Sequence, residues 1–279
     1  MSPEQILVTK ADGSTEPFSE EKLRESLKRA GAHGAVIDAV VKHIEGELVQ
    51  KLSTSHIYNH AFSVLRNLEK PIAARYSLRR ALIGFGPSGF PFEKFLAELF
   101  KAEGYTALTG QMVKGACVEH EIDVVAYNEN ELIMVESKFH NTPGEKSDLK
   151  VALYVKARFD DLIEQTFNYG KPRPLDEGWL VTNTKFSSKA IEYGMCTGLK
   201  MIGWNYPDKG NLQEMIEKNK LHPITCLTTL AVTEKEDLLD NGLVLCKSVR
   251  DTEALKALGF KEDKVREIRE EAQLLCELT

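Results

Sequence analysis

The stretch that decides the fold is Glu121-Ile-Asp-Val-Val-Ala126 followed by Met134-Val-Glu-Ser-Lys138. Both runs are rich in Val, Ile and Met with charged residues set among them, a composition that favours β-strands. The polar residues Tyr127 to Asn130 predict a turn between the two runs. A hairpin that turns near Glu129-Asn130 places residues opposite each other when their numbers add to about 259.

This register predicts that Asp123 faces Glu136 across the hairpin. Side chains alternate along a strand, so Lys138 shares the face of Glu136. Two carboxylates and an ammonium are then expected within roughly 5 Å of one another. Such a cluster on apolar strands is costly unless a cation neutralises it. Magnesium prefers oxygen ligands, and a lysine beside it can position water or stabilise developing charge. The alternative is a solvent-facing hairpin, which is the commoner origin of a lone Glu-x-Lys triplet.

The surrounding segment alternates between helical and strand patterns. Apolar residues from Phe92 to Phe100 recur at helical spacing and predict one buried helix face. Together with the hairpin, these elements predict an α/β sandwich with a mixed sheet. The further expected elements are a helix over Leu149 to Tyr169, a strand over Gly178 to Val181, a helix carrying Ala190 and Ile191, and a strand over Met201 to Trp204.

The segment resembles the Mrr-type restriction endonuclease family of PD-(D/E)xK nucleases over about 120 residues. The resemblance rests on Glu93 in the opening helix, Asp123, Glu136 and Lys138, and on the loop Leu180-Val-Thr-Asn-Thr-Lys-Phe-Ser187. It implies a divalent-metal-dependent DNA endonuclease that uses Mg²⁺ or Mn²⁺. Glu93, Asp123 and Glu136 would hold the metal, and with Lys138 they would form the catalytic set.

Two further features of this segment are less distinctive. The family often carries a Gln or basic residue in the helix after Glu-x-Lys, and Gln165, Lys156 and Arg158 are the candidates. We expect each of them to lie on a solvated helix face. We expect His140, two residues beyond Lys138, to be an ordinary exposed histidine rather than a residue that supports the site.

The N-terminal segment predicts a short hairpin against a helix bundle. A strand is expected over Ile6 to Thr9, followed by a turn at Asp12-Gly13. Ser19 is expected to cap the first helix, a Ser53/Thr54 pair the third, and Pro71 to begin the fourth.

This segment resembles the ATP-cone, a regulatory nucleotide-binding domain, over nearly all of residues 5–82. The resemblance rests on Val8-Thr-Lys10, Asp12-Gly13, Glu16-Pro-Phe18 and Ala74-Arg-Tyr76, among others. It implies ATP or dATP as an allosteric ligand, and a degenerate cone that binds nothing is the alternative. No Gly-x-x-x-x-Gly-Lys-(Ser/Thr) motif occurs, so the nucleotide is not expected to be a fuel. The residues implied to line the nucleotide are Val8, Lys10, Glu16, Lys22, Thr54 and Ile57.

Composition divides the chain of 279 residues into three segments. Breakers in Gly84-Phe-Gly-Pro-Ser-Gly-Phe-Pro91 mark one joint, and Leu221 to Thr225 marks another. We therefore expect an α/β and α+β multidomain protein: an ATP-cone over 1–86, a nuclease domain over 87–222 and a helical domain over 223–279. The first segment has 12 basic and 10 acidic residues, and each of the others is net −4.

The whole chain has a net charge of −6, which is unusual for a protein that coats nucleic acid. Metal-site carboxylates account for part of that charge. The longest stretch without Asp, Glu, Lys or Arg is 14 residues, too short to span a membrane. The five cysteines are scattered, so neither a disulfide framework nor a zinc site is expected, and a cytoplasmic location fits.

The C-terminal segment predicts about four short helices. Leu255 to Phe260, followed by Lys264 and Arg266, is weakly similar to a helix-hairpin-helix, although a protein-contacting cap is an equal alternative. The leading hypothesis is a nucleotide-regulated DNA endonuclease, acting on DNA as a homo-oligomer and without a membrane partner. The second is an ATP- or dATP-responsive DNA-binding or assembly protein in which an inactive nuclease fold is a scaffold.

Overall fold

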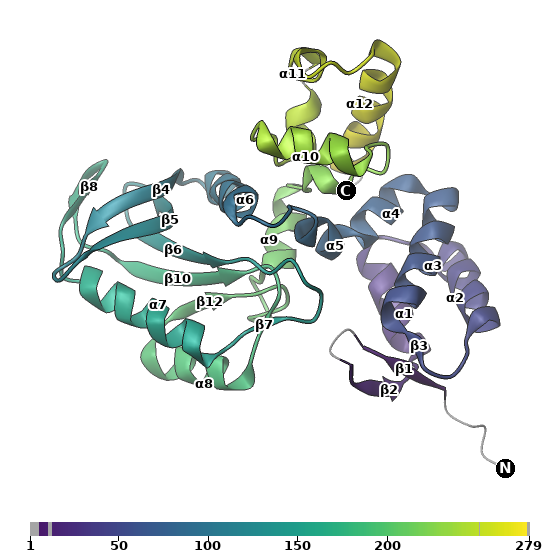
Figure 1. Ribbon diagram of the computed structural model, residues 1–279, viewed down its shortest axis with the longest axis horizontal. Helices are drawn as coiled ribbons and strands as arrows, with labels where there is room; N and C mark the ends of the chain where they lie inside the picture. Colours follow the sequence, from purple (N-terminus) through teal and green to yellow (C-terminus); the bar gives the residue numbers. More distant parts are fainter. Residues whose placement is uncertain (1–5, 11–12, 251, 278–279) are drawn as a thin grey trace.

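The computed structural model describes residues 6–10, 13–250 and 252–277. Figure 1 shows three units: an N-terminal bundle at the right, a sheet flanked by helices at the left, and a C-terminal group of helices above them. The fold is mixed α/β, as the sequence predicts.

The N-terminal unit is a small sheet against helices. Strand β1 (Leu7–Thr9) pairs antiparallel with β2 (Thr15–Pro17) and parallel with β3 (Leu52–Ser53). The predicted strand and the helix caps at Ser19 and Ser53 are confirmed, because both serine side chains accept a backbone N–H from the first turn. Asp12 of the predicted turn lies outside the described residues. The helices are α1 (Glu20–Arg29), α2 (Gly34–Glu47), α3 (Thr54–Leu68), α4 (Lys70–Tyr76) and α5 (Leu78–Ile83).

The middle unit is a five-stranded mixed sheet in the order β12-β10-β6-β5-β4. The three strands at one edge are antiparallel, and β6, β10 and β12 run parallel. Strand β4 was not predicted, because its polar and apolar residues do not alternate regularly and only two of its residues are buried. The strands are β4 (Thr106–Lys114), β5 (Glu119–Tyr127), β6 (Leu132–Lys138), β10 (Glu177–Thr182) and β12 (Lys200–Ile202).

Helices cover both faces of this sheet (Figure 1). Helix α6 (Phe90–Ala102) packs on one face together with α9 (Leu212–Asn219). Helices α7 (Leu149–Leu162) and α8 (Ser188–Thr197) pack on the other face. The predicted long helix ends at Leu162 rather than Tyr169, because the chain then forms the hairpin of β8 (Phe167–Tyr169) and β9 (Lys171–Arg173).

Two polar loops at the edge of this unit form a separate ladder. Strand β7 (Lys146–Ser147) lies in the loop after β6, the strand that carries Glu136 and Lys138, and β11 (Lys185–Phe186) lies in the loop after β10. They pair in parallel, with Lys146 opposite Lys185 and Ser147 opposite Phe186. Strands of two residues are too short for any sequence pattern to predict.

The C-terminal unit is helical, as predicted, although its last helix is long. A single apolar cluster runs from α4 and α5 through α6 into this unit, so its core is continuous with that of the sheet. Glu271 is buried and accepts hydrogen bonds from the backbone and hydroxyl groups of Thr228 and Thr229. The elements are η1 (Ile224–Cys226), α10 (Val232–Asp240), η2 (Cys246–Arg250), α11 (Thr252–Ala257) and α12 (Glu262–Glu277).

Candidate functional site

Asp123 lies in the middle of β5 and Glu136 near the end of β6, and the pairing of these two strands brings them together. Val124 stands opposite Val135, so the residue numbers add to 259 and the predicted register is confirmed. The regular ladder stops there, and one Asp123 carboxylate oxygen accepts the backbone N–H of Ser137 at 2.7 Å. Asp123 is therefore fixed against the strand that carries Glu136.

The other neighbour of Asp123 is equally irregular. Pairing between β4 and β5 runs through Thr109 and Val124 and resumes at Gln111 and Ile122, so Gly110 and Asp123 are left out of the ladder. Gly110 has a φ of 60°, a conformation that favours glycine. This local break leaves Asp123 free to turn toward the strand end.

Glu136 is the most buried carboxylate of the site, with 7% of its surface exposed. It forms an ion pair with Arg158 and accepts a hydrogen bond from the Tyr154 hydroxyl at 3.1 Å. These two residues are four apart on α7 and therefore lie on one helix face. The expectation that Arg158 faces solvent is wrong, because α7 packs across the sheet and turns this face toward β6.

Glu93 approaches from the first turn of α6. Burial, and then the negative charges of Asp123, Glu121 and Glu136, raise the pKa of Glu93 to about 7. Burial and the charge of Asp123 likewise raise the pKa of Glu136 to about 7. Burial also raises the pKa of Asp123. The carboxyls thus share one electrostatic environment in which extra positive charge would be stabilising.

Lys138 follows at the end of β6. Its carbonyl accepts a hydrogen bond from the Thr182 hydroxyl at 2.7 Å, which ties β6 to the loop after β10. Among the residues that the structure describes, its ammonium forms no ion pair or hydrogen bond. The side chain lies on the wall of a cavity of about 510 Å³ that Pro87 and His140 also line. Lys138 is therefore available to an incoming anionic group.

His140 is not the ordinary exposed histidine that the sequence suggested. Its ring bonds to the Glu145 carboxylate at 2.9 Å and the Ser147 hydroxyl at 3.0 Å. Its backbone N–H and C=O are both bonded by the Asn183 side chain, at 2.9 and 2.8 Å. His140 thus joins the loop after β6 to the loop after β10. These two loops lie far apart in the sequence.

The donor chemistry of Glu93, Asp123 and Glu136 fits a hard divalent cation, since all the donors are carboxylate oxygens. Burial, and after it the repulsion among these carboxylates, raises the pKa of Glu93 and of Glu136, and a bound cation would offset both effects. In the described ranges 6–10, 13–250 and 252–277, their oxygens do not all lie within 4.8 Å of one another, so binding a metal ion would require these side chains to move closer together.

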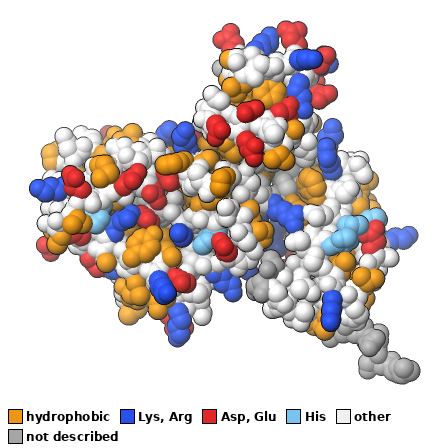
Figure 2. Space-filling model, in the orientation of Figure 1, with side chains coloured by type: hydrophobic (Ala, Val, Ile, Leu, Met, Phe, Trp, Pro, Cys, Tyr) orange, Lys and Arg blue, Asp and Glu red, His pale blue; other side chains and the backbone are white. Residues whose placement is uncertain are grey.

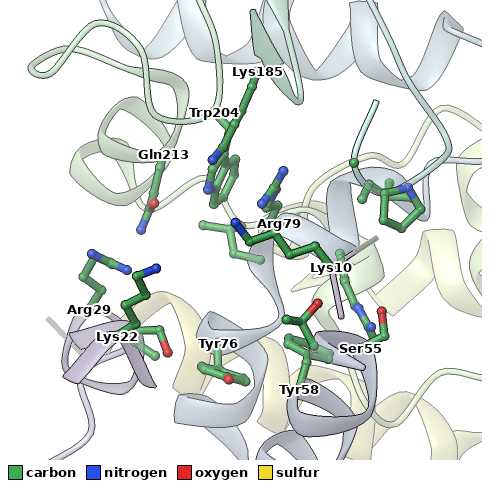
Figure 3. Close-up of a pocket in the computed structure, with 18 of the residues that line it drawn as sticks. Lys10, Lys22, Arg29, Ser55, Tyr58, Tyr76, Arg79, Lys185, Trp204 and Gln213 are labelled. Carbon is green, nitrogen blue, oxygen red and sulfur yellow. The ribbon is translucent and has the colours of Figure 1, made fainter. Parts of the chain in front are cut away.

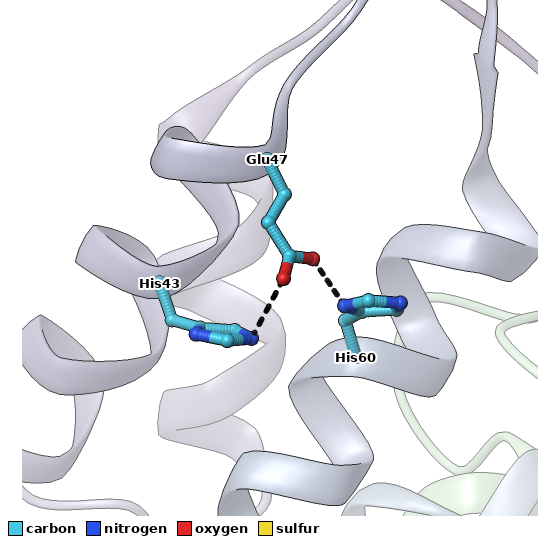
Figure 4. Close-up of side chains that lie close together, drawn as sticks. All are labelled: His43, Glu47 and His60. Atoms are coloured by element: carbon cyan, nitrogen blue, oxygen red, sulfur yellow. Dashed lines mark ion pairs between the residues drawn. The ribbon is translucent and has the colours of Figure 1, made fainter.

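The group that does meet this distance is His43, Glu47 and His60 (Figure 4). The Glu47 carboxylate contacts the His43 ring at 3.4 Å and the His60 ring more closely. Because Glu47 joins α2 to α3 and all three side chains are at least a third exposed, the cluster acts as a surface link between two helices.

A cavity of about 710 Å³ lies between the N-terminal unit and the sheet unit. Of the six residues expected to line a nucleotide, Lys10, Glu16, Lys22 and Thr54 line it. The other two, Val8 and Ile57, are buried in the core beneath, so the structure does not bring them to the cavity. The wall has three acidic residues and eight basic ones. The basic residues are Lys10, Lys22, Arg29, Arg75, Arg79, Arg80, Lys146 and Lys185.

Glu16 organises the N-terminal side of this cavity. Its carboxylate pairs with the ammonium of Lys10 at 2.7 Å and of Lys22 at 3.2 Å. The hydrogen bond from Lys10 is the main cause of the lowered pKa of Glu16. Nearby, the Arg80 guanidinium lies 3.8 Å from the centre of the Tyr58 ring. The wall thus presents cations and an aromatic group together.

Comparison with known proteins places these units in families. Residues 6–82 match the ATP cone domain, residues 87–205 the restriction endonuclease family, and residues 222–276 the family described as AF1548-like, C-terminal. The crystal structure of AF1548, a protein of unknown function, aligns over its whole length with 69% of this chain at 35% identity and a TM-score of 0.57. The chain belongs to the AF1548-like family.

An uncharacterised protein of Archaeoglobus fulgidus is also similar to this AF1548-like chain. It is 38% identical over 180 residues, which are 64% of this chain and 98% of that protein. Two other solved structures, VC1899 from Vibrio cholerae and Can2 from Sulfobacillus thermosulfidooxidans in complex with cyclic tetra-adenylate, align at TM-scores of 0.30 and 0.32. TM-scores this low do not relate the chain to either protein.

The comparisons confirm the two resemblances drawn from the sequence. This AF1548-like protein joins an ATP-cone domain to a restriction endonuclease-like domain. The suggested helix-hairpin-helix has less support, because Lys264 donates to the Thr229 carbonyl and pairs with Glu234 within its own unit. Among the described helices, none has the length and apolar character of a membrane span.

Proposed function

We propose that this protein is a nucleotide-regulated, divalent-metal-dependent endonuclease that hydrolyses phosphodiester bonds in DNA. The observation that carries the proposal is the meeting of Asp123 from β5 with Glu136 and Lys138 from the paired strand β6, beside Glu93, in a restriction endonuclease-like domain. A surface hairpin does not explain a Glu136 that is 7% exposed.

The metal would be Mg²⁺ or Mn²⁺, held by Glu93, Asp123 and Glu136. When bound, such an ion lowers the pKa of a coordinated water and polarises a phosphoryl oxygen. Lys138 would contact the phosphate that is cleaved and stabilise the charge that develops on it. Arg158 and Tyr154 would hold Glu136 in position, because both bond its carboxylate from α7.

The ATP-cone would supply regulation by ATP or dATP. Lys10, Lys22 and Thr54 line a cavity large enough for a small-molecule ligand.

The proposed units are residues 1–86, 87–222 and 223–279. Homo-oligomerisation stays a prediction, which light scattering would measure. All five cysteines are free thiols, which supports a reducing compartment such as the cytoplasm.

Cleavage of supercoiled plasmid by the full chain, with Mg²⁺ or Mn²⁺ and with or without ATP or dATP, tests this function. Glu136→Ala and Lys138→Ala are expected to abolish nicking, whereas the exposed control Glu164→Ala keeps it. Folded protein that leaves every DNA form intact under all of these conditions would refute the nuclease assignment.

A second candidate is the ATP- or dATP-responsive DNA-binding or assembly protein with an inactive nuclease fold. The observation in its favour is that Arg158 and Tyr154 already satisfy Glu136. Calorimetric titration with Mg²⁺ separates the two candidates. A nuclease binds the ion in a manner that Asp123→Asn weakens, whereas a scaffold shows no such site.

A further inference from the structure

Two lysines of the restriction endonuclease-like domain stand directly opposite each other without an acidic partner between them. Lys146 of β7 pairs in register with Lys185 of β11. Like charges at directly opposed positions destabilise a ladder. No ion pair is formed by either ammonium within the part of the chain that the structure describes. The ladder therefore carries a repulsion that an anion would remove.

A third cation joins them from the helix that ends the N-terminal unit. Arg79 of α5 has its Nε atom buried and without a hydrogen-bond partner among the described residues. Desolvation, and then the charges of Arg79, Lys146 and Lys10, lower the pKa of Lys185. Three cations from three separate segments thus lie close together with Glu16 as the acidic neighbour of Lys185, an arrangement in which a polyvalent anion would be stabilised.

These cations face the same cavity as the ATP-cone residues. Figure 3 shows Lys185 and Trp204 entering it from the sheet unit, Lys22 and Arg29 from the opposite side, and Arg79 beside Lys10 between them. The whole wall has eight basic and three acidic residues, a formal excess of five positive charges. One carboxylate, that of Glu16, is already shared by two lysines.

We propose that Lys146, Lys185 and Arg79 form a phosphate-binding wall, so that the polyphosphate of a nucleoside triphosphate is held by the cone and the nuclease domain together. This inference rests on the proposed binding of nucleotide by the cone. The volume of about 710 Å³ is that of a small-molecule site. A DNA duplex is too wide to enter such a cavity, and acidic and basic side chains are interspersed on the described face in Figure 2.

The same two loops support the strand that carries Lys138. Lys146 is flanked by Glu145 and Ser147, which both bond the His140 ring. Lys185 follows Thr182 and Asn183, whose side chains bond the backbone of Lys138 and His140. A polyphosphate that neutralises both lysines would stabilise the β7–β11 ladder, and through it the end of β6.

A ligand shifts a conformational equilibrium only toward the state that it binds more tightly. Here the favoured state is the paired ladder, which is also the state that fixes the Lys138 strand. The nucleoside triphosphate is therefore expected to activate cleavage rather than inhibit it. A nucleoside monophosphate offers these lysines fewer phosphate groups and less negative charge, and is therefore expected to activate less than a triphosphate.

The test compares the full-length protein with the double variant Lys146→Gln/Lys185→Gln. A matched control, Lys150→Gln/Lys189→Gln, removes two charges from exposed positions of α7 and α8 in the same domain. Calorimetry with ATP and with AMP is expected to show at least tenfold weaker ATP binding by the double variant, unchanged AMP binding, and a control that matches wild type. Stimulation of plasmid cleavage by ATP should be lost.

The outcomes separate this inference from the proposed function. Wild-type ATP affinity in a folded double variant, or inhibition of wild-type cleavage by ATP, would overturn the inference and leave the cone and nuclease assignments standing. Weakened DNA binding with unchanged ATP binding would assign the lysines to DNA and likewise overturn it. Absence of ATP binding by wild-type protein would refute nucleotide regulation itself, and the shared wall with it.

Discussion

Glu136→Gln is expected to stabilise the metal-free protein at pH 8 and to have a much smaller effect on its stability at pH 5. The carboxyl is 7% exposed, and its pKa is raised from 4.5 to about 7. The folded state therefore binds this proton more tightly than the unfolded state, and stability falls as pH rises from 4.5 through 7. The difference, 7 − 4.5, corresponds to about 3 kcal/mol in the free energy of unfolding at pH 8.

Glutamine has the shape of the protonated carboxyl and removes this titration. Arg158 loses a charged partner but keeps its hydrogen bond to the Glu121 carbonyl at 3.1 Å. The assay is urea unfolding with a chelator at pH 5 and pH 8, with the exposed turn residue Glu129→Gln as the control. Equal destabilisation at both pH values would refute the reasoning. Saturating Mg²⁺ at pH 8 should stabilise wild type but not Glu136→Gln.

Three further changes test other parts of the fold. Glu271→Ala should lower the free energy of unfolding by about 3 kcal/mol, because the buried carboxylate accepts four hydrogen bonds. The control, Glu270→Ala, changes an exposed residue and should have little effect. Equal losses of stability in the two variants would contradict this prediction. Burial lowers the pKa of His222 from 6.5 to about 4. The free energy of unfolding of the wild type should therefore fall by up to about 3 kcal/mol as the pH drops from 6.5 to 4. In urea unfolding experiments, His222→Gln should reduce this dependence on pH. Gly178→Ala should lower the free energy of unfolding by about 1–3 kcal/mol, since the new Cβ would lie 2.4 Å from the Phe159 ring. If the variant were as stable in urea as the wild type, the Phe159 ring would have moved to make room for it.

The hairpin of the candidate site was predictable because its information is local. Asn128 accepts hydrogen bonds from the backbone of Asn130 and Glu131, which fixes the turn, and the turn fixes the register. Once the register is known, alternation places Glu136 and Lys138 on one face. Glu93 came only from family resemblance, since nothing local links it to the hairpin.

The remaining parts of the site depend on how distant elements pack. Arg158 and Tyr154 reach Glu136 only because α7 crosses the sheet at that strand, although their spacing of four residues was a signal. The pairing of Lys146 with Lys185 depends on two loops that meet in space and on strands too short to predict. The cavity beside them forms where the N-terminal unit packs against the sheet unit. The periodicity of apolar residues within each unit does not predict how the two units pack together.

The apolar cluster that runs from α5 into the C-terminal unit has a consequence for the linker at Gly84 to Pro91. Leu78 and Leu82 on one side of that linker are buried against residues that follow it by well over a hundred positions. The Thr225 hydroxyl also bonds the Ala81 carbonyl at 2.6 Å. A chain cleaved within the linker is therefore expected to remain assembled as two fragments, held together by the same contacts that hold the subunits of an oligomer.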